Sequence, residues 1–213
     1  MRRVIFCKQA IDQMDADKIF DELEAELHRE VGRMVATWSQ LEGWLAHILT
    51  LLLVRSGRGR EGETIYYEVP NLRPRIAVMN AAFFNRSDIG EDIQKRWSAL
   101  IAATEKEAVE RNSIVHGDFL RGTVGNSDLA VAVSPKVFSD MRRKHPPKGV
   151  SKMGFHSVDI RRHTERVALL RDALWALYGD LPDSEDAKPP RSAEEYLDAW
   201  RVARGQREWP SVS

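Results

Sequence analysis

The chain has 213 residues, 43% of them hydrophobic, and its 32 Lys and Arg residues balance 32 Asp and Glu residues. A neutral chain of this length buries a sizeable core, but it has no overall field that attracts nucleic acid or a membrane, so any such binding must depend on a local patch. The single cysteine excludes an intrachain disulfide and a cysteine-rich zinc site.

The apolar stretches of the chain are short. Residues 4–6 form far less than the apolar core of a signal peptide. The longest run, from Ile48 to Val54, is far shorter than the roughly 20 residues that a membrane-spanning helix needs. We therefore expect a cytoplasmic protein that makes no membrane contact.

A long amphipathic helix is predicted near the start of the chain. Apolar residues recur there at alternating steps of three and four, which places them on one helical face. They are Phe20, Leu23, Leu27, Val31, Met34, Trp38, Leu41, Leu45, Ile48 and Leu52. Trp44, Leu49, Leu51 and Leu53 make other faces of its second half apolar, so we expect partner helices to surround that half. His47 lies in the same half and is predicted to be a core histidine.

Two further helices are predicted before the hydrophobic period of the chain changes. A glycine-rich segment, residues 56–62, ends the first helix, and a second helix is expected near residues 75–84. Asp88, with Glu91 three residues later, predicts a capped start for a third helix that runs to Val115.

The hydrophobic period changes after this third helix. Residues 119–124 and 129–133 flank a short polar turn and predict a β-hairpin. A basic loop, residues 135–149, follows, and residues 157–178 return to a helical period. Cations begin this last helix and oppose its dipole, which indicates an anionic neighbour. They are Arg161, Arg162, His163 and Arg166.

The expected fold is mainly α, an up-and-down helical bundle with a small β-hairpin inserted after the third helix. The bundle is expected to occupy residues 1–180, with the hairpin and basic loop at about 118–156. Residues 181–213 are expected to form a linker and a short helix, which packs on the domain or on a second subunit through Trp200 and Trp209. Ser192 and Glu195 form a capping box for that helix.

An arginine interrupts the apolar stripe of the third helix. The helical period places Arg111 on the same face as Trp97, Leu100 and Thr104. A guanidinium there loses hydration and needs a carboxylate, a ligand phosphate or a subunit interface to compensate. Asn112 and His116 are four residues apart and share a face at the end of the helix. This segment is therefore the candidate functional site.

The segment Arg111-Asn112-Ser113-Ile114-Val115-His116 resembles the Arg-polar-x3-5-His motif of the HEPN superfamily, a group of four-helix, mostly prokaryotic domains. The order of helices is similar over roughly residues 17–178. The resemblance implies a HEPN-like bundle and a metal-independent endoribonuclease, in which two protomers pair so that their motifs line one cleft. A toxin or phage-defence effector, with an antitoxin or a defence-system partner, is the expected biological context.

The residue types themselves suit RNA cleavage. RNA carries its own nucleophile, the 2′-hydroxyl, so the protein must move protons and stabilise charge on the phosphate oxygens. An imidazole in general titrates near neutral pH, so a histidine at position 116 is suited to acid–base catalysis. The guanidinium of Arg111 offers donors to phosphate oxygens, and Asn112 is suited to orient His116 or a phosphate. No metal or other cofactor is expected.

Other interpretations of the segment remain open. Arg111 pairs with Glu107, or with Glu42 of the first helix, if its role is only structural. A non-catalytic module for dimerisation or protein binding, or a sensor of nucleotide ligands, would carry the same residues. Glu105 and Glu110 also lie near the motif, and a polyanion would approach it only if such carboxylates faced away.

The basic loop is a second candidate for RNA contact. Its dense run of charges is suited to phosphate binding, although a solvated loop is the alternative interpretation. The residues concerned are Arg142, Arg143, Lys144 and Lys148.

Overall fold

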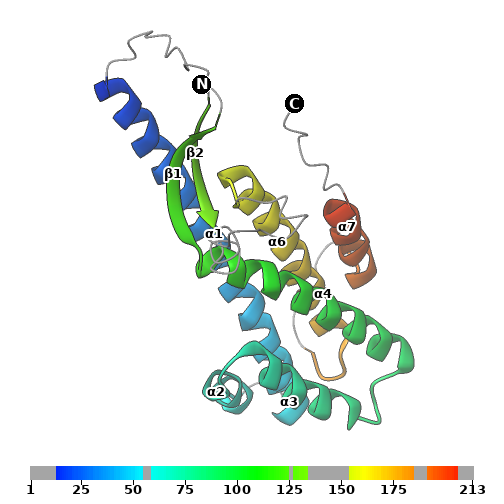
Figure 1. The fold of residues 1–213 in the computed structure, drawn as a ribbon. Helices are drawn as coiled ribbons and strands as arrows, with labels where there is room; N and C mark the ends of the chain where they lie inside the picture. The colour runs from blue at the N-terminus through cyan, green and yellow to red at the C-terminus, as the bar shows by residue number, and fades with distance from the viewer. Residues whose placement is uncertain (1–12, 55–58, 125–126, 134–153, 185–190, 206–213) are drawn as a thin grey trace, which may run out of the picture. The chain divides into compact units, whose positions relative to one another are not determined.

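The described part of the chain is mainly helical (Figure 1). The structure is a computed structural model and describes residues 13–54, 59–124, 127–133, 154–184 and 191–205. The elements are α1 (Gln13–Val54), α2 (Glu61–Glu68), α3 (Leu72–Phe84), α4 (Glu91–Val115), β1 (Asp118–Val124), β2 (Ser127–Val133), α6 (Ser157–Asp180) and α7 (Ala193–Gly205). None of the described helices is long and apolar enough to cross a membrane.

The chain folds into two compact units, and three helices pass from one unit into the other. The first unit contains residues 1–31 and 113–160, and the second contains residues 32–112 and 161–213. Helix α7 therefore belongs to the second unit, together with most of α1, α4 and α6.

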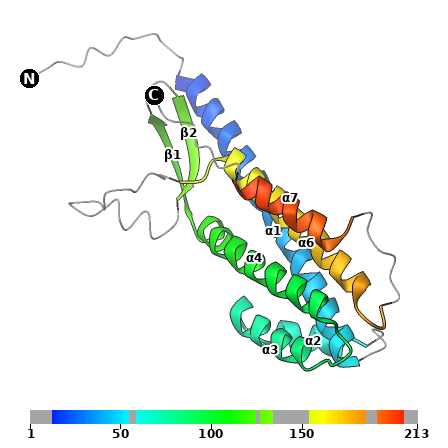
Figure 2. The ribbon, with the colours of Figure 1, turned by 90° about the vertical axis from the view of Figure 1, so that its right-hand side faces the viewer.

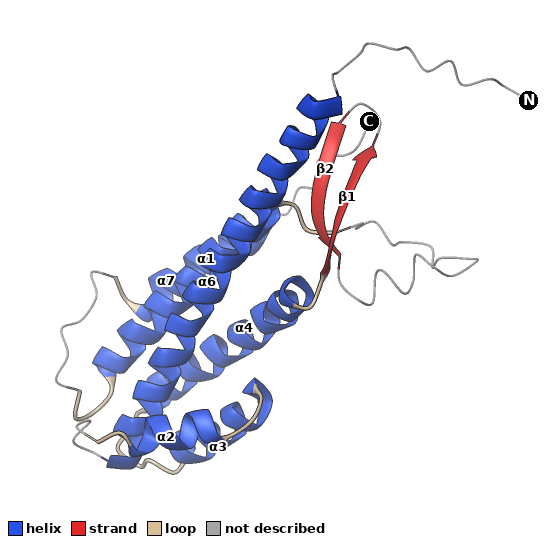
Figure 3. Cartoon of the chain, turned by 90° about the vertical axis from the view of Figure 1, so that its left-hand side faces the viewer, coloured by secondary structure: helices blue, strands red, loops and turns tan. Residues whose placement is uncertain are grey.

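In the first unit, β1 and β2 form an antiparallel pair (Figure 3). Asp118 lies opposite Val133, and Val124 lies opposite Ser127. This pair occupies the segment after α4 in which the change of period predicts two strands.

The second unit contains a large apolar core, built from every helix that enters it (Figure 2 shows α2, α3 and α4 in cyan to green). Leu41, Leu45 and Ile48 of α1 are fully buried, as are Leu49 and Leu51 on its other faces. The prediction that partner helices surround this half of α1 is correct on the faces of Leu49 and Leu51, but not on the face of Leu53, which is 47% exposed. The rings of Trp97 and Phe83 stack with centroids 4.6 Å apart, and Trp97 Nε1 donates to Asn80 Oδ1 at 2.8 Å.

Helix α2 was not expected from the sequence, because Gly62 indicates a break in a helical pattern. The glycine instead allows α2 to approach α1 closely: a Cβ at this position would lie 2.3 Å from Thr50 Cα. The core prediction for His47 is wrong. Its side chain is 51% exposed, and its Nδ1 lies 3.0 Å from Glu63 Oε1 on α2.

Two helix caps were predicted from the sequence, one at the start of α7 and one at the start of α4, and only the first is present. The capping box of α7 is confirmed, because Ser192 N–H donates to Glu195 Oε2 at 2.7 Å and Glu195 N–H donates to Ser192 Oγ at 3.3 Å. The cap predicted at Asp88 is wrong. The helix begins at Glu91, so Gly90 occupies the N-cap position, and both oxygens of the Asp88 carboxylate accept hydrogen bonds from Arg86, at 2.6 and 2.5 Å.

Candidate functional site

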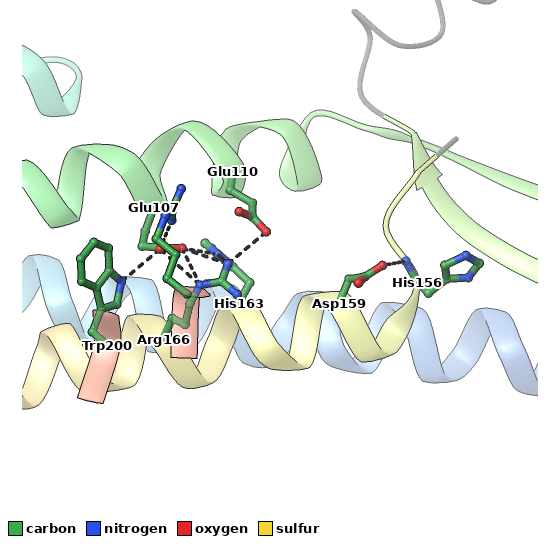
Figure 4. Close-up of polar contacts among 8 residues, drawn as sticks. Glu107, Glu110, His156, Asp159, His163, Arg166 and Trp200 are labelled. Carbon is green, nitrogen blue, oxygen red and sulfur yellow. Dashed lines mark hydrogen bonds and ion pairs between the residues drawn. The ribbon is translucent and has the colours of Figure 1, made fainter. Parts of the chain in front are cut away.

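A cluster of ionic groups is buried beside the C-terminal half of α4 in the second unit (Figure 4). Glu107 lies at its centre, and three helices contribute its members, which we call the Glu107 cluster. They are Glu107 and Glu110 from α4, His163 and Arg166 from α6, and Trp200 and Arg204 from α7.

Glu107 is fully buried and accepts hydrogen bonds from both partner helices. Arg166 donates through Nε and Nη2, both 3.2 Å from the carboxylate oxygens, and His163 Nδ1 lies 2.8 Å from Oε2. Trp200 Nε1 donates to Oε1 at 3.1 Å, and Arg204 Nη1 also donates to Oε1. Helix α7 is thereby attached to α4 by polar bonds as well as by apolar packing.

The partners of Glu107 determine its charge. Burial by itself raises the pKa of this carboxyl. The hydrogen bond from His163 and the charge of Arg166 lower the pKa by more than burial raises it, so that the pKa falls to about 2. Arg166 is also buried, and its Nη2 lies 3.1 Å from Glu110 Oε1. Burial lowers the pKa of Arg166, whereas the charges of Glu107 and Glu110 raise it, with a net increase. Glu107 and Arg166 are therefore both charged near neutral pH.

The sequence carried a partial signal for this cluster. The cations at the start of α6 indicate an anionic neighbour, and the structure gives Glu107 and Glu110 as the neighbours of Arg166. Arg161 and Arg162 are instead exposed. The sequence predicts that Trp200 attaches the C-terminal tail to the domain or to a second subunit, and its hydrogen bond to Glu107 attaches α7 to α4. The role of Arg204 was missed, because it depends on the tertiary packing of α7.

Three side chains of the Glu107 cluster are of types that can bind a metal ion. Glu107, Glu110 and His163 offer ligand atoms that all lie within 4.8 Å of one another. Arg166 contacts both carboxylates, so an added cation would meet a positive charge at the position that it needs. The arrangement therefore suits an internal ion-pair network better than a metal centre.

Arg111, the arginine that interrupts the apolar stripe, also lies on α4. Arg111 is partly buried, and its Nη1 donates to Asn112 Oδ1 at 2.9 Å. Its Cζ lies over the ring of Trp38 on α1, 5.8 Å from the ring centroid. Its Nε is buried and has no hydrogen-bond partner among the described residues.

Neither carboxylate that was considered as a partner of Arg111 is paired with it. Glu42 Oε1 accepts a hydrogen bond from Arg75 Nη1 at 2.8 Å, and Glu107 is bound by Arg166. Arg75 itself lies over the ring of Tyr66, 4.7 Å from the centroid, and donates to the carbonyl of Val69. Glu42 thus belongs to a different, partly buried ion pair of the second unit.

The other residues of the motif are open to solvent. Asn112 is exposed and is the last residue of α4 that belongs to the second unit. His116 is exposed and follows directly after Val115, the last residue of α4, in the first unit. The helix ends there with a hydrogen bond from Gly117 N–H to the Ile114 carbonyl at 3.1 Å.

Comparison with other proteins gave no relative. No protein-family model, no curated protein and no solved structure matches this chain. The chemistry of its own residues therefore carries the functional argument.

The candidate residues of the basic loop lie outside the described residues. They are Arg142, Arg143, Lys144 and Lys148.

Proposed function

We propose that the protein is a metal-independent endoribonuclease of HEPN type, in which Arg111, Asn112 and His116 act on the RNA backbone. We further propose that it works as a homodimer and serves as a toxin or a phage-defence effector, held in check by an antitoxin or another defence-system partner. The motif at the end of α4 is the basis of both proposals.

The observation that carries the proposal is the state of Arg111. Its guanidinium is partly removed from water, yet no carboxylate among the described residues pairs with it, because Glu42 is bound to Arg75 and Glu107 to Arg166. A guanidinium in such a place retains donors for an anion from outside. A phosphate of RNA has the matching charge and geometry.

The charge around the motif supports the same proposal. Glu107 is buried and bound by cations, and Glu110 is paired with Arg166. These two carboxylates therefore oppose a polyanion less than their positions in the sequence indicate. Glu105 is exposed to solvent.

The proposed reaction is a transesterification within the RNA. His116 accepts the proton of the 2′-hydroxyl, and the resulting oxygen attacks the adjacent phosphorus. Arg111 stabilises the negative charge on the non-bridging oxygens. The bond to the 5′-oxygen breaks, and a proton from the second copy's imidazole completes the 5′-hydroxyl product. The other product is a 2′,3′-cyclic phosphate.

Incubation of the purified protein with single-stranded RNA in excess EDTA tests the proposal. We expect cleavage that leaves cyclic phosphate ends, and loss of at least about a hundredfold in rate for His116→Ala. His47→Ala, which removes an exposed imidazole elsewhere, is the matched control and should cleave at the wild-type rate. Equal cleavage by wild type and His116→Ala would reject the assignment.

The same experiment separates the alternative functions. A wild-type protein that cleaves no RNA, but whose dimerisation changes in Arg111→Ala, would be a non-catalytic interaction module. A protein that cleaves no RNA and gains thermal stability with one nucleotide of a panel would be a ligand sensor.

A further inference from the structure

The contact between Trp38 and Arg111 is the feature that the motif alone does not explain. The two residues come from α1 and α4, are 73 positions apart in the chain (111 less 38), and both belong to the second unit. Trp38 is 3% exposed, and the Arg111 Cζ lies 5.8 Å from its ring centroid. This distance is within the range in which the negative face of an indole attracts a cation.

A ring contact restrains an arginine differently from an ion pair. A carboxylate partner occupies the N–H groups of the guanidinium, which lie in its plane. A ring beneath the guanidinium attracts the charge through the face and leaves the in-plane donors available. Arg111 uses Nη1 for Asn112, and its Nε is buried without a hydrogen-bond partner among the described residues, so a phosphate would approach the Nη atoms rather than Nε.

We propose that Trp38 is the positioning residue of Arg111, whose ring face holds the guanidinium on α4 with donors free for a phosphate of RNA. This inference rests on the proposed endoribonuclease function. Trp38 is buried and touches no substrate, so it acts only through Arg111. Its contribution is to kcat, because it fixes the guanidinium for the charge that develops during attack.

The structure offers a matched pair of tryptophans for the test. Trp97 is also buried, but it stacks on Phe83 and donates to Asn80, with no cation assigned to its ring among the described residues. Tryptophan with one, two or three ring fluorines, introduced at position 38 or at position 97, weakens the negative face while nearly preserving the shape. The fold is therefore retained, whereas a truncation at either position would create a cavity.

We expect kcat for single-stranded RNA to fall stepwise with the number of fluorines at position 38, by roughly three- to tenfold for three fluorines. KM should change little, and the same series at position 97 should leave kcat within about twofold. The Arg111 Nε–H resonance, assigned with Arg111→Lys, should be shifted by the ring current of Trp38. Trp38→Leu should abolish that shift.

The outcomes distinguish this inference from the proposed function. If wild type cleaves RNA, Arg111→Ala does not, and fluorination at position 38 leaves kcat unchanged, the role of Trp38 is rejected while the endoribonuclease stands. An equal fall in kcat for the position 97 series would also reject it, since packing would then explain the effect. A wild-type protein without RNA cleavage would reject both.

Discussion

At the scale of single residues, Glu107 holds the most heavily bonded position in the described part of the second unit. Its carboxylate is fully buried and is bound by cations from α6 and α7. Breaking a buried ion pair by neutralising one partner leaves the other charge without compensation, whereas loss of an exposed charge has little effect. The stability of the unit should therefore depend strongly on this side chain.

Glu107→Gln should lower the free energy of unfolding by about 3–5 kcal/mol, since Arg166 would remain buried without its main partner. Urea denaturation followed by circular dichroism measures the change. Glu105→Gln, an exposed position on the same helix, is the control and should change stability by less than about 0.5 kcal/mol. Similar values for the two variants would show that the network contributes little.

The low pKa of Glu107 also predicts how stability changes with pH. Its pKa is about 2 in the folded protein against an ordinary value of 4.5. A lowered carboxyl pKa adds stability that is fully present above pH 4.5 and disappears as the pH falls toward 2. The loss across this window should be roughly 3 kcal/mol, and it should be absent in Glu107→Gln. Acid titrations of both proteins at fixed urea concentration measure it.

At the scale of elements, the packing of α2 against α1 depends on a glycine. Gly62 is buried, and a Cβ there would lie 2.3 Å from both the N and Cα atoms of Thr50. Gly43 in α1 is also helical, but nothing lies within 4 Å of a Cβ at that position. Identical substitutions at the two glycines therefore separate helix propensity from helix packing.

Gly43→Ala should stabilise the protein by about 0.5–1 kcal/mol, because alanine loses less backbone entropy in a helix. Gly62→Ala should instead destabilise it by about 1–3 kcal/mol, because the methyl group forces α2 away from α1. Thermal unfolding monitored by circular dichroism gives both signs. A stabilising effect at Gly62 would contradict the close approach of the two helices.

At the scale of the whole molecule, the balance of charges means that only local groups of basic residues can attract RNA. The 32 basic and 32 acidic residues leave no net field to draw a polyanion toward the protein. The proposed function therefore needs a local patch, for which the sequence offers the basic run in residues 142–148. Attraction by such a patch weakens steeply with salt.

Replacing the four candidate phosphate contacts by alanine should raise KM for single-stranded RNA and reduce its dependence on salt, with kcat nearly unchanged. They are Arg142, Arg143, Lys144 and Lys148. Steady-state cleavage at several salt concentrations measures the slope. Exchange of exposed Arg29 and Arg33 for alanine is the control. An unchanged slope in the loop variant would assign RNA contact to other residues.

The sequence by itself determined the helical character of the chain, the apolar faces of its helices, the capping box at Ser192 and the anomalous position of Arg111. These features depend on local periodicity and on neighbours within one or two turns. Only the tertiary structure decided which charges meet. Glu42 pairs with Arg75, 33 positions away, and Glu107 with Arg166, 59 positions away.

The physical reason is that periodicity gives the face on which a side chain lies, but not the helix that covers this face. Two arginines and a histidine converge on Glu107, and none of the groups bound to it is Arg111. The same packing brings Trp38 to Arg111. An arginine that the sequence marked as unusual is thus left by the fold with an aromatic neighbour in place of a carboxylate.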